Sequence, residues 1–261
     1  MRHELRLFLI ALQFLTRVHV PAGLGYRDEW LHASARHFPA VGLLVGGFGA
    51  LVLWASAWAW PLAVAVLLSM AATVWITGAF HEDGLADTCD GLGGAVSRER
   101  ALQIMKDSRI GSYGAIGLLL VLALKAAALH GLASRDLVLA LLALPAAHAL
   151  SRGVPVVLLV LLRYAGDAEH SKAKPMAQQV SHASLGVALG WCLLAALVAL
   201  MSGVGGVALG AAAAALVAIT VLAARWLQRR LGGYTGDTLG AAQQVAELVV
   251  YLALLAAPGP R

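Results

Sequence analysis

Charge is scarce in this 261-residue chain. Only 13% of the residues are charged, whereas soluble proteins carry about 25%. Residues 38–80 contain no Asp, Glu, Lys or Arg at all. A water-soluble globule is therefore excluded, and so is a disordered chain, because 60% of the residues are hydrophobic. Cysteine is scarce too: Cys89 and Cys192 stand in different segments, which excludes a disulfide-stapled scaffold.

Long apolar runs take the place of the missing charge. A membrane crossing needs about 20 predominantly apolar residues. Seven runs approach that length, at 38–58, 61–80, 115–133, 137–162, 183–201, 204–224 and 239–257. Helices are expected in all of them, since barrel strands are about 10 residues long and strictly alternating. The sequence predicts an all-α fold: a polytopic integral membrane bundle of about seven transmembrane helices, in a single domain over 1–261.

The segment 1–37 differs from these runs. From residue 5 to 15 it is apolar, with Arg6 and Arg17 on one helical face, which indicates a helix lying in the membrane interface. A cleaved signal peptide is the alternative, and the lack of a small-residue cleavage site disfavours it. We expect an N-terminal interfacial helix and linker, followed by the helix bundle 38–261.

Basic residues gather on one predicted side of the membrane. They occur in the N-terminal segment and in the loops 81–114, 163–182 and 225–238: Arg2, Arg6, Arg17, Arg27, Arg36, Arg98, Arg100, Lys106, Arg109, Arg163, Lys172, Lys174, Arg225, Arg229 and Arg230. Because positively charged loops stay in the cytoplasm, we expect the N-terminus and these three loops to be cytoplasmic. No nucleic-acid partner is expected, since no soluble face interleaves basic with aromatic residues.

Acidic residues cluster in the first of these loops. Six of the 14 lie between positions 82 and 107: Glu82, Asp83, Asp87, Asp90, Glu99 and Asp107. If the preceding helix continues, Asp83, Asp87 and Asp90 share one face and repel one another, so a cation is expected between them. Carboxylate ligands favour Mg²⁺, Mn²⁺ or Ca²⁺ over zinc. The structural alternative is a solvated acidic cap on a loop.

Two further segments carry cations beside glycines. Lys106 and Arg109 precede a glycine-containing turn, and Arg230 precedes the run 232–236. Arginine, lysine and exposed backbone amides bind phosphate oxygens, and a helix N-terminus beginning near Asp237 is a further anion site. The alternatives are an ordinary juxtamembrane loop for the first segment and a glycine-punctuated turn for the second.

Three charges fall inside predicted helices: Lys125, Arg152 and Glu247. Ionisable groups at that depth are costly and are usually functional or paired. Two interpretations are open for Glu247: it lines the site, or it pairs with Lys125 or Arg152 to hold helices together.

Three segments together resemble a known family. Residues 78–91 (GAFHEDGLADTCDG), 105–111 (MKDSRIG) and 232–241 (GGYTGDTLGA) are similar to signature segments of the bacterial cobalamin synthases, the adenosylcobinamide-GDP ribazoletransferases. The resemblance implies a multi-pass inner-membrane enzyme with Mg²⁺ as cofactor. Its substrates would be adenosylcobinamide-GDP and α-ribazole or α-ribazole 5′-phosphate, with GMP as the leaving group. A homo-oligomer is compatible with this sequence.

The resemblance implies roles for individual residues. The family's acidic positions correspond to Glu82, Asp83, Asp87, Asp90, Asp107 and Asp237, with Lys106 and Arg109 as accompanying cations. We expect the first four acids to hold Mg²⁺, and the two cations to hold phosphate oxygens. The proton acceptor would be His81, Asp107 or Asp237. Arg230, Gly233 and Gly236 are expected at the phosphates, and Cys89 receives no role.

Two other functions are compatible with parts of the pattern. Residues 87–91 match the opening D-x-x-D-G of the CDP-alcohol phosphotransferases, but the rest of that pattern is missing from Leu92 onward. A cation transporter would place acids at mid-bilayer in several helices, whereas here only Glu247 is deep. Both are disfavoured relative to ribazole transfer.

Overall fold

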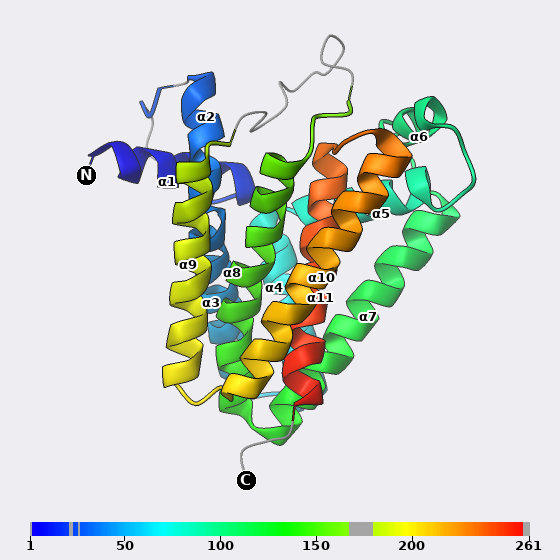
Figure 1. Ribbon diagram of the computed structural model, residues 1–261. Coiled ribbons are helices and arrows are strands. Elements are labelled where there is room, and N and C mark those ends of the chain that lie inside the picture. The colour runs from blue at the N-terminus through cyan, green and yellow to red at the C-terminus, as the bar shows by residue number, and fades with distance from the viewer. Residues whose placement is uncertain (1, 21–22, 26, 167–179, 258–261) are drawn as a thin grey trace.

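A computed structural model describes residues 2–20, 23–25, 27–166 and 180–257 (Figure 1). Over these residues the secondary structure is helical and contains no β-strand; an isolated parallel bridge joins Tyr164 to Tyr234. The predicted all-α class is therefore confirmed.

Seven long helices form the bundle. They are α3 (Phe38–Ser56), α4 (Leu62–Thr77), α7 (Ser112–Arg135), α8 (Leu137–Leu161), α9 (His182–Met201), α10 (Gly206–Leu231) and α11 (Gly236–Ala256). Five shorter elements are α1 (Arg2–Leu15), α2 (Asp28–Ser34), the 3-10 helix η1 (Ala35–His37), α5 (Phe80–Leu92) and α6 (Arg98–Met105). In the described part of the chain, six helices are long and apolar enough to cross a membrane, or seven if α4 and α5 form one broken span.

Two of the predicted C-terminal helix ends differ from the structure by three or more residues. The helix predicted over 61–80 stops at Thr77, because Gly78 (φ 69°) and Ala79 (φ 58°) both adopt the left-handed conformation. The chain then turns by 89° into α5. The helix predicted over 204–224 continues to Leu231, so the basic residues at its end belong to the helix.

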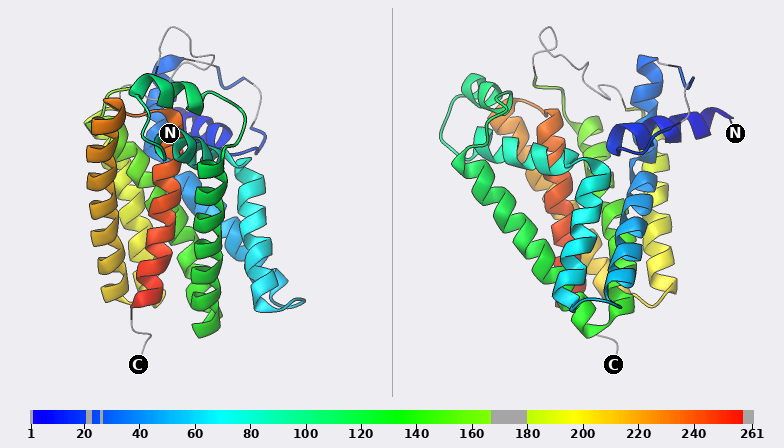
Figure 2. Two further views of the ribbon diagram at one scale, coloured as in Figure 1. Left: turned by 90° about the vertical axis from the view of Figure 1, so that its right-hand side faces the viewer. Right: turned by 180° about the vertical axis from the view of Figure 1, so that it is seen from behind.

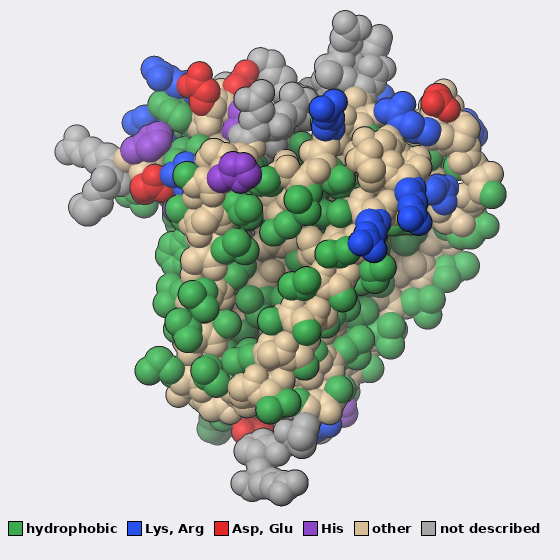
Figure 3. All heavy atoms as spheres, viewed as in Figure 1, with side chains coloured by type: hydrophobic (Ala, Val, Ile, Leu, Met, Phe, Trp, Pro, Cys, Tyr) green, Lys and Arg blue, Asp and Glu red, His purple; other side chains and the backbone are tan. Residues whose placement is uncertain are grey.

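The short elements gather at one end of the bundle. Figures 1 and 2 show α1, α2, α5 and α6 at the end opposite the C-terminus, with α1 and α5 running across the long helices; we call this the loop end. Lys and Arg side chains also gather there in the view of Figure 3, while the flanks of the long helices are largely apolar. Helix α5 thus runs across the bundle at its loop end, and it is not one of the six helices that are long and apolar enough to span a membrane by themselves.

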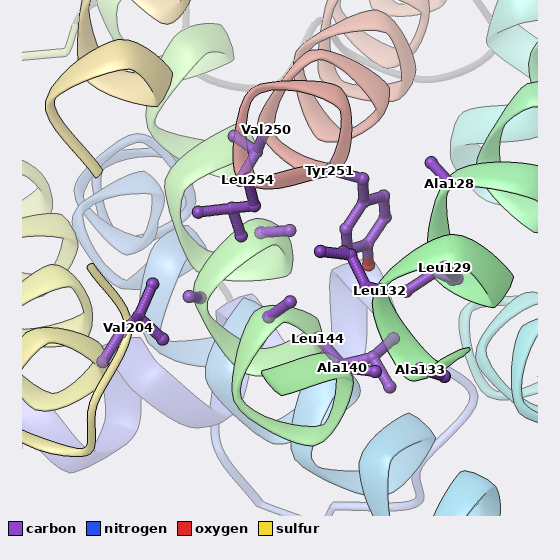
Figure 4. Close-up of a cluster of buried hydrophobic side chains, with 14 of the residues drawn as sticks. Ala128, Leu129, Leu132, Ala133, Ala140, Leu144, Val204, Val250, Tyr251 and Leu254 are labelled. Atoms are coloured by element: carbon purple, nitrogen blue, oxygen red, sulfur yellow. The ribbon is translucent and has the colours of Figure 1, made fainter. Parts of the chain in front are cut away.

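Close packing holds the long helices together. Leu129, Leu132, Leu144, Tyr251 and Leu254 form part of a buried cluster between α7, α8 and α11 (Figure 4). In a bilayer, helices associate through van der Waals contact and small residues, since lipid is as apolar as the core.

Glycines bring α3 and α8 together. A Cβ on Gly46 would lie 2.5 Å from the Leu144 carbonyl oxygen, and one on Gly42 would overlap the His148 carbonyl. These two glycines therefore allow the backbones of α3 and α8 to approach closely.

Candidate active site

An acidic face forms where α5 crosses the start of α11. Asp83 is exposed and Asp87 half-buried on the outer face of α5, and Asp237 is half-buried in the first turn of α11. The two backbones touch at a glycine: a Cβ on Gly84 would lie 2.7 Å from the Asp237 carbonyl oxygen. This crossing brings together carboxylates that are about 150 residues apart in the sequence.

The carboxylates perturb one another. The pKa of Asp87 is raised from 3.8 to about 7, first by burial and then by the negative charges of Asp237, Asp83 and Asp90. A neutral or cation-bound carboxyl is favoured where like charges converge. The acidic face therefore suits a hard cation or a proton at Asp87.

Asp90 supports the next helix. Its two carboxylate oxygens accept hydrogen bonds from the backbone amides of Gly111 (2.7 Å) and Gly114 (2.8 Å). These amides lie at the start of α7, where backbone N–H groups lack helical partners and favour negative charge. Asp90 thus fixes the position of α7 relative to the acidic face, and each oxygen keeps a lone pair.

The loop after α6 carries an exposed ion pair. The Arg109 guanidinium donates to the Asp107 carboxylate, with a shortest distance of 2.6 Å, and these hydrogen bonds lower the pKa of Asp107 to about 2. Asp107 is thus a poor proton acceptor while this pair is formed. Lys106 follows the last residue of α6, has an exposed side chain and has no ion pair among the described residues.

Arg230, Gly233 and Gly236 were all expected at the phosphates. The Arg230 guanidinium donates to the carbonyls of Leu92 (3.3 Å) and Gly94 (3.0 Å), which ties α10 to the end of α5. Gly233 leaves no room for a side chain against the carbonyl of Arg163. Of the three, only Gly236, exposed at the first residue of α11, has open space around it. Arg230 and Gly233 thus hold the backbone around the site in place.

Glu82 and His81 point away from the acidic face. Glu82 is buried, and its Oε1 accepts from Gln244 at 3.1 Å. His81 is buried as well, and its pKa is held well below its usual range by burial and then by the positive charge of Arg152. The structure therefore separates both residues from the aspartates with which the sequence grouped them.

A buried polar network lies beneath α5. Lys125 of α7 pairs with Glu247 of α11 at 2.7 Å and donates to Gln244 at 3.1 Å. Gln243 donates to Glu247 at 2.8 Å and to Ser151 of α8 at 2.9 Å. Of the two interpretations of Glu247, the structure therefore supports the one in which it pairs with Lys125 and holds helices together.

Sequence reasoning identified the charges of this network but missed most of its neutral members. His148 accepts from Arg152 at 3.0 Å, and Tyr251 donates to Glu247 at 3.3 Å. Gln243 and Gln244 stand near Glu247 in the sequence, whereas nothing in the sequence singled out His148 or Tyr251.

The carboxylates do not form a complete metal cage. Within the described ranges, no group of three or more His, Cys, Asp or Glu side chains is arranged to hold a metal ion. The oxygen-only donors of the acidic face and the mutual repulsion at Asp87 nevertheless fit Mg²⁺, which takes one or two carboxylates and completes its shell with water and phosphate. Lys172 and Lys174 lie outside the described residues.

Comparisons with known proteins agree with these motifs. Residues 7–255 match the cobalamin-5-phosphate synthase family. A protein of Leptothrix cholodnii named adenosylcobinamide-GDP ribazoletransferase is 66% identical over 97% of this chain and 96% of its own length. Proteins of the same name from Shewanella amazonensis (47% identical; 97% and 96% covered) and Ralstonia nicotianae (45%; 98% and 97%) also match. No solved structure matches the chain.

These matches extend over nearly the whole chain, including the positions of all three motifs. They favour neither a CDP-alcohol phosphotransferase nor a cation transporter. The chain belongs to the cobalamin-5-phosphate synthase family.

Proposed function

We propose that this protein transfers the adenosylcobinamide phosphate moiety of adenosylcobinamide-GDP to α-ribazole or its 5′-phosphate, with release of GMP. The printed name of the relatives supports this reaction. The observation that carries it is the convergence of Asp83, Asp87 and Asp237 at the crossing of α5 and α11.

The reaction places high negative charge at this face. A ribazole hydroxyl oxygen forms a bond to the phosphorus that carries cobinamide, and the bond from that phosphorus to the oxygen of GMP breaks. Mg²⁺, when bound, neutralises the diphosphate and the departing phosphate. Asp83 and Asp87 would hold it, because burial and then the charges of Asp237, Asp83 and Asp90 raise the pKa of Asp87 to about 7, and a bound cation would relieve this.

The other residues divide the remaining tasks. Asp237 is placed to receive the hydroxyl proton, since it lies beside Asp87, whereas His81 faces the buried network. Lys106, exposed and without an ion pair among the described residues, would bind phosphate oxygens, and Arg109 can reach them only by leaving Asp107. Asp90 and Arg230 act as positioning residues through α7 and α5.

The charge distribution supports an orientation. Basic side chains gather at the loop end (Figure 3), and positively charged ends of membrane proteins face the cytoplasm. We place the N-terminus and the acidic face on the cytoplasmic side of the bacterial inner membrane, with α1 lying in the interface.

Turnover by purified protein tests the proposal. Protein in detergent, with Mg²⁺, adenosylcobinamide-GDP and α-ribazole, should release GMP, and EDTA should stop the release until Mg²⁺ is restored. Asp87→Asn should lower kcat about a hundredfold or more, which is the usual effect of removing one group that stabilises transition-state charge in other enzymes. Glu29→Gln removes an exposed carboxylate from α2 and should leave kcat unchanged. Wild-type turnover by Asp87→Asn, or turnover in EDTA, would contradict the proposed metal site.

A further inference from the structure

Arg17 stands at the bend between α4 and α5. The sequence predicted it on a helical face of the N-terminal segment, but α1 ends at Leu15, so Arg17 lies in the connection that follows. Its backbone amide donates to the Ile76 carbonyl at 2.7 Å. Its side chain lies against Gly78, where an added Cβ would be 2.5 Å from Nε and 3.3 Å from Nη2. The guanidinium is therefore held close to the point where α5 begins.

This guanidinium has no structural partner in the described part of the chain. Arg17 is exposed, and it forms neither an ion pair nor a side-chain hydrogen bond with any residue that the structure describes. The last carbonyls of α4 do not need it as a cap, because the backbone amides of Gly78 (3.2 Å) and Ala79 (2.9 Å) already donate to them. Such a cation is suited to an anionic ligand, since an arginine fork matches the oxygens of a phosphate.

The bend is next to the carboxylate that would accept the hydroxyl proton. Phe14, near the end of α1, packs edge-on against Phe80, the first residue of α5, with 5.0 Å between the ring centroids. Leu15, Phe80 and Gly236 line one small cavity, and Asp237 follows Gly236. The end of α1, the start of α5 and the start of α11 therefore meet. In the right-hand view of Figure 2, α1 and α5 extend from this place to opposite sides.

A second cation stands at the other end of α5. Lys106 follows Met105, and a Cβ on Gly91, near the end of α5, would lie 2.7 Å from the Met105 Cγ. Helix α5 has 13 residues, which is about 20 Å, so Arg17 and Lys106 flank the acidic face from opposite ends. In phosphoryl transfer the attacking and leaving oxygens lie roughly in line, on opposite sides of the phosphorus. With the departing phosphate at Lys106, the attacking substrate lies on the side of Arg17.

We propose that Arg17 binds the 5′-phosphate of α-ribazole 5′-phosphate and so sets the preference for the phosphorylated substrate, an inference that rests on the proposed function. The attacking hydroxyl lies at Asp237, so the ribose lies between Asp237 and the bend. The 5′-phosphate is not transferred: it stays on the ribose and accepts hydrogen bonds from the guanidinium. Lys106 and Mg²⁺ serve the diphosphate of adenosylcobinamide-GDP.

Two other anions carry the same phosphate chemistry. The diphosphate of adenosylcobinamide-GDP is less suited to Arg17, because its proposed partners are the acidic face and Lys106, at the far end of α5. A lipid headgroup at Arg17 would be bound whichever ribazole is present, so it predicts no effect on the choice between them. Substrate preference therefore distinguishes the three ligands.

The first test compares two substrates that differ in one phosphate, α-ribazole and α-ribazole 5′-phosphate. The wild type should show a KM at least about tenfold lower for the phosphorylated form, as expected for hydrogen bonding between charged groups. Arg17→Met keeps the apolar stem and the backbone hydrogen bond to Ile76, and it should bring the two KM values within about twofold. Arg17→Lys keeps the charge without the planar fork and should retain part of the preference.

The same measurements can overturn the proposal. A preference that Arg17→Met leaves unchanged would do so: alone, it would indicate a lipid headgroup at Arg17, and with a raised KM for adenosylcobinamide-GDP it would indicate the diphosphate. A wild type without any preference would overturn it as well. In the expected case the KM for adenosylcobinamide-GDP stays within about twofold in both variants.

The second test measures binding without turnover. Equilibrium dialysis of α-ribazole 5′-phosphate, with detergent-solubilised protein and no adenosylcobinamide-GDP, should show at least about tenfold weaker binding to Arg17→Met than to the wild type. Arg6→Met is the matched control, because it removes the same charge from α1, where the Arg6 guanidinium lies 4.5 Å from the Trp30 ring centroid. It should bind as the wild type does. Equal weakening by both variants would contradict a local site at Arg17.

The outcomes separate the two proposals. If the wild type releases GMP but Arg17→Met keeps the full preference for the phosphorylated ribazole, this inference fails while the reaction stands. If α-ribazole 5′-phosphate binds at Arg17 as expected but no GMP is released in the presence of Mg²⁺ and adenosylcobinamide-GDP, the proposed reaction fails.

Discussion

At the scale of single residues, the protonation state of Asp87 determines whether the acidic face can bind a cation. Its pKa of about 7 in the folded protein lies above the value of about 3.9 expected for an unfolded chain. The folded state therefore binds more protons between these values, and stability falls as the pH rises from about 4 to about 7. Above pH 7 this penalty is fully present, unless a cation takes the place of the proton.

Cation binding should consequently depend on pH. Because a proton and Mg²⁺ compete for Asp87, the apparent Kd for Mg²⁺ should be about tenfold weaker at pH 6 than at pH 8. Titrating Mg²⁺ while recording the thermal unfolding midpoint of the detergent-solubilised protein measures both values. Asp87→Asn should bind Mg²⁺ weakly with little pH dependence, and Glu29→Gln should behave as wild type. An affinity that is the same at both pH values would rule out Asp87 as a ligand.

The sequence could predict which residues carry charge but not all of their partners. The spacing of Asp83, Asp87 and Asp90 predicts one helical face, and the structure has them on one helix. The partners of Glu82 and Arg230 could not be predicted, because Gln244 and the carbonyl of Gly94 are distant in the sequence. Side-chain contacts of this kind depend on how helices cross.

At the scale of helices, the break between α4 and α5 creates the site. An apolar run through Phe80 predicted one helix, and hydropathy alone contains no signal for a turn there. Gly78 was the available signal, since glycine often ends helices in the left-handed conformation. The left-handed Ala79 costs roughly 1–2 kcal/mol. The backbone amide of Arg17 also donates to the Ile76 carbonyl at 2.7 Å, which anchors the end of α1 to this bend.

The crossing of α5 and α11 depends on Gly84. Gly84→Ala places a methyl group 2.7 Å from the Asp237 carbonyl oxygen, so the helices must separate and the carboxylates move apart. We expect kcat to fall at least about tenfold, since small displacements of catalytic groups carry large costs, together with a lower unfolding temperature. Rates of GMP release and thermal unfolding measure both effects.

Gly47→Ala is the matched control for this substitution. Gly47 is exposed on α3, and its added methyl group would meet nothing within 4 Å. It should retain activity and gain up to about 1 kcal/mol, the usual benefit of alanine over glycine in a helix. Full activity in Gly84→Ala would show that the close approach is dispensable.

At the scale of the whole molecule, charge is divided between two regions. The acidic face lies at the loop end, while Lys125 pairs with Glu247 inside the bundle, where Arg152 and Glu82 are also buried. Hydropathy predicted the long helices well, because each must satisfy its own backbone in lipid. It could not predict the network, whose members come from α5, α7, α8 and α11.

The buried network should behave as one unit in unfolding. Glu247→Gln leaves Lys125 without its counter-charge, and Lys125→Met leaves Glu247 without its counter-charge. Removing one partner of a buried pair costs about 3–5 kcal/mol, whereas removing both is often close to neutral. The double variant should therefore unfold at a higher temperature than either single variant, with a coupling free energy of at least about 1 kcal/mol. Reversible unfolding of the four proteins in mixed micelles gives this value. Additive losses would mean that the pair contributes no mutual stabilisation and that Gln243, Gln244 and Tyr251 satisfy each charge independently.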